Sequence, residues 1–333
     1  MTPIQNCIIN KNTKSKPLWI MRQAGRYLPE FREIRAKNSD FIKLCLNESL
    51  SSEITLQPIK RFNFDAAIIF SDILMLPHGL GQTVKFEKNF GPRLEEVNLE
   101  LLKNVDEVDF SHKLNPVYKA ISQVSNTLDL KRKDVIGFVG APWTILVYMI
   151  NKISPKNGLN ENFFQDEFLI NRLLIIIEKF LKIHIKNQIK AGATLIQIFD
   201  SWAGLVKEKI PEFIYIPTLN IVEFVKSQNV PVICFPRGIK DYKTYCEILK
   251  PDMVNIDYET DPKLVEKNIN IPIQGGLDPK ILLTDKENMR KEVTKYLNIF
   301  KDHPYVFNLG HGILPETKIE MVEELINLVR NFK

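Results

Sequence analysis

Short apolar runs recur along the chain, and each is followed by polar or glycine-containing sequence. Eight of these runs read as buried strands, because they are short and are bounded by turn signals. They lie at residues 18–21, 66–70, 135–139, 194–199, 230–235, 253–256, 271–274 and 305–308. Most of the segments between them place apolar residues at helical spacing, as residues 165–190 do.

Strands that alternate with helices predict an α/β fold with a parallel sheet. Eight repeats without an internal linker favour a closed (β/α)8 TIM barrel, with residues 17–333 as a single catalytic domain. The alternative is a doubly wound open sheet, which more usually carries a glycine-rich phosphate fingerprint after its first strand. Here residues 22–26 read RQAGR, with one glycine. Residues 1–16 are predicted to be a polar N-terminal arm, and residues 73–93 a long loop rich in Pro and Gly.

Composition narrows the possible partners. The chain has 333 residues, 44% hydrophobic and 26% charged, which is typical of globular proteins. A net charge of +5 suits an acidic ligand but is too small to predict a nucleic-acid partner.

Targeting signals and cysteines point to the cytoplasm. The most apolar segment, residues 168–189, is interrupted by charges, so we expect an amphipathic helix rather than a membrane span. The first 16 residues lack the apolar core of a signal peptide. The four cysteines are scattered without metal-binding spacing, which is typical of reduced thiols in a cytoplasmic protein.

Residues 17–35, PLWIMRQAGRYLPEFREIR, combine a buried run with four arginines and no lysine. Only 11 of the 45 basic residues in the chain are arginine, so four arginines without a lysine are more than chance would give. The stretch therefore requires the guanidinium group itself and not just a positive charge. The planar fork of guanidinium binds carboxylate or phosphate bidentately, so the stretch predicts an anion site after the first strand. The alternative is a solvated helix start in which these arginines pair with Glu30 and Glu33.

Polar residues also follow the other predicted strands, and a (β/α)8 barrel builds its active site at these carboxyl ends. Each has an ordinary explanation on its own: Asp72 and Ser201 as helix caps, Tyr148 as a core residue, Arg237 as a surface charge. His311 lies between two glycines, which allow close approach to a ligand. Their shared position predicts a site. The sequence has no HExxH, P-loop, GxSxG or paired Cys/His pattern, so we expect chemistry without a metal.

The motifs resemble a known family. Residues 17–35 and residues 137–148, GFVGAPWTILVY, look like the two signature stretches of the uroporphyrinogen decarboxylases of haem biosynthesis. FSDIL, GGLD and LGHGI match as well and in the same order, so the resemblance runs from about residue 17 to residue 315. One departure follows Tyr148, where the family usually has a glycine pair and this chain has Met149 and Ile150.

The resemblance implies a cytoplasmic homodimer that removes CO2 from the four acetate side chains of uroporphyrinogen III. The product is coproporphyrinogen III, and the reaction proceeds by pyrrole protonation without a cofactor. The implied substrate-binding residues are Arg22, Arg26, Arg35, Asp72, Tyr148, Ser201 and His311. Among them Asp72, Arg22 and Tyr148 are the catalytic candidates. A substrate with eight carboxylates agrees with the choice of arginine in residues 17–35.

Two other functions remain open at this stage. A related barrel methyltransferase acting on cobalamin or thiol substrates would need a His/Cys zinc set, and Cys234 has no matching partner in the sequence. A catalytically inactive porphyrinogen-binding barrel is the second alternative. The presence of both Asp72 and Tyr148 argues against that alternative.

Overall fold

Parallel strands form a curled sheet in the computed structural model, which describes residues 1–87 and 90–332. Within those ranges the sheet has seven strands, in the order β1 (Ala66–Ile68), β4 (Asp134–Gly140), β5 (Leu195–Asp200), β6 (Val232–Pro236), β7 (Met253–Ile256), β8 (Ile273–Gly275) and β9 (Tyr305–Val306). Neighbours in the sheet are also neighbours in this sequence order, and every pair is parallel. The prediction of an α/β fold with a parallel sheet is therefore confirmed.

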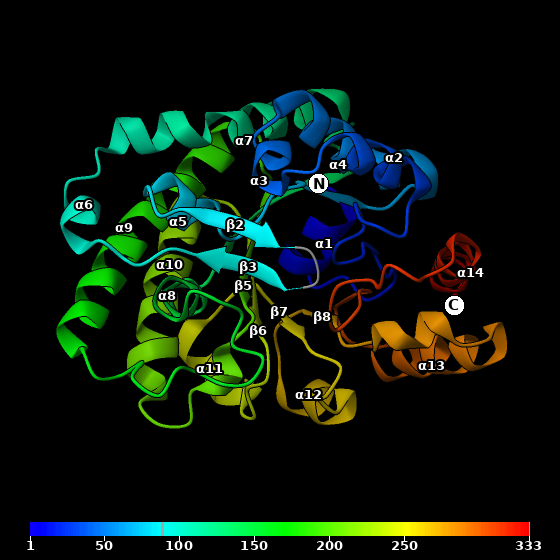
Figure 1. The fold of residues 1–333 in the computed structure, drawn as a ribbon. Helices are drawn as coiled ribbons and strands as arrows, with labels where there is room; N and C mark the ends of the chain where they lie inside the picture. Colours follow the sequence, from blue (N-terminus) through cyan, green and yellow to red (C-terminus); the bar gives the residue numbers. More distant parts are fainter. Residues whose placement is uncertain (88–89, 333) are drawn as a thin grey trace.

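Helices surround the sheet (Figure 1). They are α1 (Pro3–Ile9), α2 (Pro29–Lys37), α3 (Phe41–Cys45), α4 (Glu48–Phe62), α5 (Met75–Gly79), α6 (Leu99–Lys103), α7 (Glu107–Thr127), α8 (Pro142–Asn151), α9 (Glu167–Lys190), α10 (Ile216–Ser227), α11 (Tyr242–Leu249), α12 (Pro262–Asn268), α13 (Lys286–Ile299) and α14 (Ile319–Arg330). Among the described helices, none has both the length and the apolar character needed to cross a bilayer.

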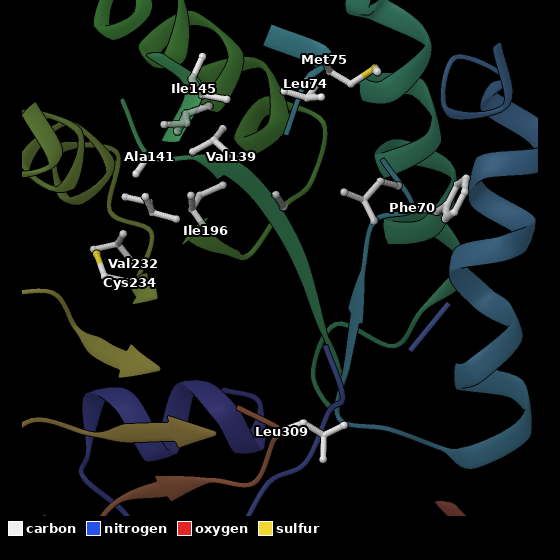
Figure 2. Close-up of a cluster of buried hydrophobic side chains, with 14 of the residues drawn as sticks. Phe70, Leu74, Met75, Val139, Ala141, Ile145, Ile196, Val232, Cys234 and Leu309 are labelled. Atoms are coloured by element: carbon white, nitrogen blue, oxygen red, sulfur yellow. The ribbon is translucent and has the colours of Figure 1, made fainter. Parts of the chain in front are cut away.

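Side chains along each strand alternate between two apolar clusters, as the period of a β-strand requires. In β6, Val232 and Cys234 pack in the larger cluster, between the sheet and the helices (Figure 2). Ile233 and Phe235 belong instead to the smaller cluster, inside the curl of the sheet. Both clusters consist of buried apolar side chains, so the register of each strand is fixed by which residues must be buried on which side.

The prediction of a strand at residues 18–21 is wrong in one respect: the stretch makes only a single parallel bridge, between Leu18 and Phe307. Side-chain oxygens accept the hydrogen bonds that a neighbouring strand would otherwise accept. Leu18 N donates to Asp65 Oδ2 (2.7 Å), Ile20 N to Gln23 Oε1 (3.1 Å) and Met21 N to Asn308 Oδ1 (2.8 Å).

The same stretch still connects the two edges of the sheet. On the β9 side, Trp19 N donates to the carbonyl of Phe307 (3.4 Å), and Phe307 N donates to that of Pro17 (2.8 Å). On the β1 side, Asp65 N donates to the carbonyl of Leu18 (3.0 Å). Residues 17–20 therefore lie between β9 and β1 and lead directly into the arginine-rich loop.

Helix α1 lies within residues 1–16, which the sequence led us to expect as a polar arm. Its Ile4, Cys7 and Ile8 are buried in the cluster inside the sheet. Asp134, the first residue of β4, accepts hydrogen bonds from the Thr2 hydroxyl and from Gln5 Nε2 (2.8 Å). The helix thus covers the amino-terminal end of the strands, and ligands must approach from the carboxyl end.

Residues 73–93, predicted as a loop, contain regular structure, so that prediction is wrong. They include α5 and most of an antiparallel hairpin, β2 (Val84–Glu87) and β3 (Gly91–Leu94). The hairpin is held to α3 by an edge-to-face contact of Phe86 with Phe41, whose ring centroids are 4.5 Å apart. An ion pair between Arg93 and Glu87 (3.1 Å) crosses its two strands.

Candidate functional site

Arg22 occupies a strained backbone position at the carboxyl end of the sheet. Its φ is +63°, in the left-handed region that residues other than glycine seldom adopt. A Cβ on Gly312 would overlap the Cδ and Cγ atoms of the Arg22 side chain. The glycine is needed because the guanidinium stem passes directly over the loop that follows β9. Strain of this kind is kept where it serves function, so it supports a binding role for Arg22.

Asp72 lies four residues beyond β1, and its side chain is partly buried. Its Oδ1 accepts a hydrogen bond from Leu74 N (2.9 Å), two residues further on. This bond closes a turn and does not cap a helix, because α5 begins at Met75 without a side-chain cap. Burial raises the pKa of Asp72 from 3.8 to about 6, although the Leu74 hydrogen bond and the charge of Arg22 oppose the rise. The group is therefore mostly ionised at neutral pH, and the bond from Leu74 uses only one of its two oxygens.

Tyr148 and Ser201 approach the site from adjacent elements, α8 and the end of β5. The ring of Tyr148 meets that of Trp202 edge to face, with centroids 6.1 Å apart. Trp202 N in turn donates to the Thr144 hydroxyl (3.1 Å), which donates to the buried carboxylate of Asp200 (2.6 Å). Burial raises the pKa of the Tyr148 phenol, and the negative charge of Asp72 adds to the rise, so Tyr148 keeps its proton.

His311 follows β9 and is partly buried. Burial, together with the guanidinium charges of Arg22 and Arg237, lowers its pKa from 6.5 to about 4. The imidazole is therefore neutral at physiological pH and serves as a hydrogen-bonding group rather than as a cation.

Arg26 and Arg35 line a different hollow from Arg22. This cavity has a volume of about 410 Å³ and is bounded by Arg26, Phe31, Arg32, Arg35, Ala36, Pro315 and Glu316. Arg35 donates to the carbonyl of Asn38, and its guanidinium lies 5.8 Å from the ring centroid of Phe41. Arg26 and Arg35 therefore line a surface cavity beside the loop that carries His311.

The alternative of a solvated helix start is only partly correct: Arg22, Arg26 and Arg32 are exposed, but in the described part of the chain they do not pair with Glu30 or Glu33. Glu30 forms a two-point ion pair with Arg61 of α4, at 2.9 and 3.0 Å, and not with an arginine of residues 17–35. Across residues 1–87 and 90–332, Arg22 and Arg26 have no carboxylate within ion-pair distance. Their charges remain available for a ligand.

The structure gathers most of the predicted residues. The charge of Arg22 affects the pKa values of Asp72, Tyr148 and His311, and Ser201 immediately precedes Trp202, whose ring contacts Tyr148. Arg26 and Arg35 are set apart in their own cavity. Two neighbours were missed: Trp202, which contacts Tyr148, and Arg237, interpreted as a surface charge but half-buried beside His311. The alternation of β6 could have identified Arg237, because Ile233 and Phe235 face the interior.

The stretch after Tyr148 differs from the family pattern without breaking the helix. Helix α8 continues to Asn151 and ends at Lys152, which has a φ of +64°. A left-handed residue is the usual end of a helix, and glycine adopts it at the lowest cost. Here the lysine takes that conformation and pairs with Glu96 (2.9 Å).

A metal site built from protein ligands is not evident. In the described part of the chain, no three His, Cys, Asp or Glu side chains are grouped so that they could hold an ion.

The chain is similar in sequence to proteins named uroporphyrinogen decarboxylase. Residues 1–332 match the family model described as uroporphyrinogen decarboxylase (URO-D). The chain is 39% identical over 329 residues to the uroporphyrinogen decarboxylase of Rickettsia africae (strain ESF-5), covering 97% of this chain and 95% of that protein. Its identity to the uroporphyrinogen decarboxylase of Orientia tsutsugamushi (strain Ikeda) is 38% over 345 residues, covering 100% and 99%. A solved structure, a methyltransferase from Methanosarcina mazei, has a TM-score of 0.78 at 15% identity and covers 98% of this chain and 97% of its own, which shows a shared fold alone.

Replacing Asp72 by Asn should stabilise the folded protein at neutral and alkaline pH. Between pH 3.8 and about 6 the folded protein keeps a proton that the unfolded chain has lost, so its stability falls as the pH rises. Above this window Asp72→Asn should raise the free energy of unfolding by about 1–3 kcal/mol. Urea unfolding of both proteins at pH 4 and pH 8 measures the difference.

The gain should vanish near pH 4, where Asp72 is protonated in the folded state. Asp40→Asn is the matched control, because Asp40 is an exposed N-cap of α3 and Asn caps equally well. Equal unfolding free energies of wild type and Asp72→Asn at pH 8 would contradict the raised pKa.

Proposed function

The chain belongs to the uroporphyrinogen decarboxylase family, and from this premise we propose that it removes CO2 from the four acetate side chains of uroporphyrinogen III. The product is coproporphyrinogen III, an intermediate of porphyrin and haem biosynthesis. The observation that carries the proposal is the family match over residues 1–332, joined to the cluster of Arg22, Asp72, Tyr148 and His311 at one end of the sheet. The proposed cytoplasmic location suits a chain whose four cysteines are free and buried.

The proposed architecture is a closed (β/α)8 barrel in one catalytic domain, residues 17–333, preceded by the arm of residues 1–16. Residues 17–20 would occupy the position of the eighth strand, between β9 and β1. The hydrogen bonds of Phe307 and Asp65 to this segment support closure. Such a barrel keeps its active site at the carboxyl ends of the strands, which is where Arg22, Asp72 and His311 lie.

The residues proposed to bind the substrate are ones whose side chains can hydrogen-bond to carboxylates. Uroporphyrinogen carries eight of them around a flexible ring. In this proposal Arg22 and Arg26 hold carboxylates as bidentate forks, and Arg35 adds positive charge at the rim. Ser201 and the neutral imidazole of His311 complete the set as hydrogen-bonding partners. The four pyrrole N–H groups point to the ring centre, where the carboxylate of Asp72 accepts them.

The substrate ring acts as its own electron sink in this mechanism. A proton adds to a pyrrole α-carbon, and the ring becomes cationic. The bond between the acetate methylene and its carboxylate then breaks, CO2 leaves, and the electron pair neutralises the ring. Protonation of the resulting exocyclic methylene gives the methyl product, and loss of the first proton restores the pyrrole. No prosthetic group is needed to accept electrons.

Asp72 contributes by electrostatics. The positive charge of the protonated pyrrole spreads onto its nitrogen, next to the fixed carboxylate. Asp72 therefore stabilises the cation more than the neutral substrate, and only that difference accelerates the reaction. Arg22 holds the substrate at the same wall, and Tyr148 keeps its proton and supplies a hydrogen-bond donor beside Asp72.

Anaerobic incubation with uroporphyrinogen, with products separated by carboxylate number, tests the function and the role of Asp72 together. Wild type should yield the four-carboxylate product. Asp72→Asn keeps the acceptor oxygen but loses the charge, so kcat should fall at least about 10²-fold. Coproporphyrinogen binding should weaken less, because the arginines remain. An inactive wild type would overturn the function, and near-normal kcat with weak binding in Asp72→Asn would make Asp72 a positioning residue.

Replacing Arg22 or Arg26 by Lys should reduce kcat/KM by the equivalent of about 1–3 kcal/mol, because Lys keeps the charge but loses the bidentate fork. Arg61→Lys is the control, since Arg61 pairs with Glu30 near the surface, where such pairs contribute little. Full kcat/KM in both Arg22→Lys and Arg26→Lys would exclude the fork.

The protein should be a homodimer, a proposal that rests on the family resemblance. Sedimentation velocity at micromolar concentration should give twice the mass of the 38.6 kDa chain. A single species of monomer mass across that range would contradict it.

A further inference from the structure

Arg237 is the first residue after β6, at the carboxyl end of the strand. Ile233 and Phe235 of β6 pack inside the curl of the sheet. Arg237 itself lies in the turn that follows, close enough to His311 for its charge to lower the pKa of that imidazole. Its side chain is half-buried, so it is not the surface charge that its sequence context suggested.

The position is also distant from Arg22 around the sheet. Counted from residues 17–20 through β1, β4 and β5, strand β6 is the fourth step. Counted the other way, through β9, β8 and β7, it is again the fourth. Arg237 and Arg22 therefore follow strand positions on opposite sides of the sheet, and the charge of each lowers the pKa of His311.

The backbone that carries Arg237 is held rigidly. Arg237 N donates to the carbonyl of Asp200 (3.0 Å), and its own carbonyl accepts from Gly204 N (3.0 Å). Gly238 N donates to Asp257 Oδ2 (2.7 Å). A Cβ on Gly204 would lie 2.6 Å from the carbonyl oxygen of Gly238, so the two loops are in direct contact. The backbone from which the Arg237 side chain extends is therefore fixed at the carboxyl end of β6.

The charge of Arg237 lacks a counter-ion. Among residues 1–87 and 90–332, no carboxylate lies within ion-pair distance of its guanidinium, and its side chain donates no hydrogen bond to the protein. The Thr144 hydroxyl donates to one oxygen of Asp200, and both Asp257 oxygens accept backbone or hydroxyl groups. A partly exposed guanidinium that no protein carboxylate neutralises is available to pair with a bound anion.

We propose that Arg237 binds a carboxylate of the tetrapyrrole substrate from the wall opposite Arg22. The inference rests on the proposed function, which supplies a ligand with carboxylates around its whole rim. Held between two opposed guanidiniums, the ring would be centred over Asp72 rather than drawn to one side. Arg237 thus becomes a substrate-binding residue that completes the set formed by Arg22 and His311.

Steady-state decarboxylation by three variants tests the proposal. Arg237→Gln removes the charge, Arg237→Lys keeps it without the fork, and Arg172→Gln is the control, because Arg172 is exposed on α9 beside Phe168. Arg237→Gln should raise KM by about 10- to 100-fold, with a smaller rise for Arg237→Lys and none for Arg172→Gln. An unchanged KM in Arg237→Gln would overturn the proposal.

The product pattern identifies which carboxylate is bound. Propionates are retained through the reaction, so loss of a propionate contact slows all four decarboxylations alike. Acetates are consumed one by one, so loss of an acetate contact causes one partly decarboxylated intermediate to accumulate. Either pattern, together with the raised KM, supports binding by Arg237.

A measurement without substrate separates placement from function. Removing Arg237 should raise the pKa of His311, which its charge lowers, and NMR titration of the imidazole measures the shift. Arg172→Gln should leave that titration unchanged, and an unchanged titration in Arg237→Gln would overturn the placement. The unfolding midpoint of Arg237→Gln should not fall, because no protein partner is lost, and a large fall would show a structural role instead.

Should wild type decarboxylate nothing, the proposed function fails, and the binding of uroporphyrinogen, which carries both acetates and propionates, then decides the inference. Weaker binding by Arg237→Gln than by Arg172→Gln supports it, and equal binding overturns it.

Discussion

The carboxylate of Asp65 joins three parts of the chain that lie far apart in sequence. Its Oδ2 accepts Leu18 N (2.7 Å) and pairs with Arg330 of the last helix (2.8 Å). The backbone N–H of Asp65 donates a hydrogen bond to the carbonyl of Leu18, and the carbonyl of Asp65 accepts one from Asp134 N. These bonds connect residues 17–20 to β1 and β4. Without that carboxylate the Leu18 N–H would be buried without a partner, at a cost of about 1–3 kcal/mol. The position of Arg22, four residues on, depends on this anchor.

Much of the fold could be predicted from hydrophobic patterning. The strands from β1 to β9 in the main sheet are buried on both faces, so they read as continuous apolar runs. Residues 18–21 have the same pattern but not the same structure, because their hydrogen bonds go to the side chains of Asp65, Gln23 and Asn308. The hydrophobic pattern of a short stretch does not show which distant side chains will accept its backbone hydrogen bonds. The hairpin of β2 and β3 was concealed by its glycines and prolines, although Val84 to Glu87 alternate in burial.

The site was predicted through types of residue rather than through contacts. Arginine in place of lysine, and polar residues after strands, pointed to Arg22, Asp72 and His311 before any geometry was known. Their ionisation could not be predicted, because desolvation depends on what the folded chain packs around each group. Arg237 was misjudged for the same reason: one charged residue in a loop looks exposed until the strand before it fixes its direction. The ion pair of Glu30 with Arg61 was equally hidden.

The unpaired guanidiniums also act at a distance. Among the residues that the structure describes, Arg22, Arg26 and Arg237 have no carboxylate partner, and they lie at or near one end of the sheet, so the modest net charge of +5 understates the field there. A polyanion in solution is attracted toward that end before it touches the protein, and its encounters are oriented as well as accelerated. Salt screens this attraction over about 8–10 Å at physiological ionic strength. Capture of the ligand should therefore slow as ionic strength rises, while the bond-breaking steps inside the site are largely shielded from it.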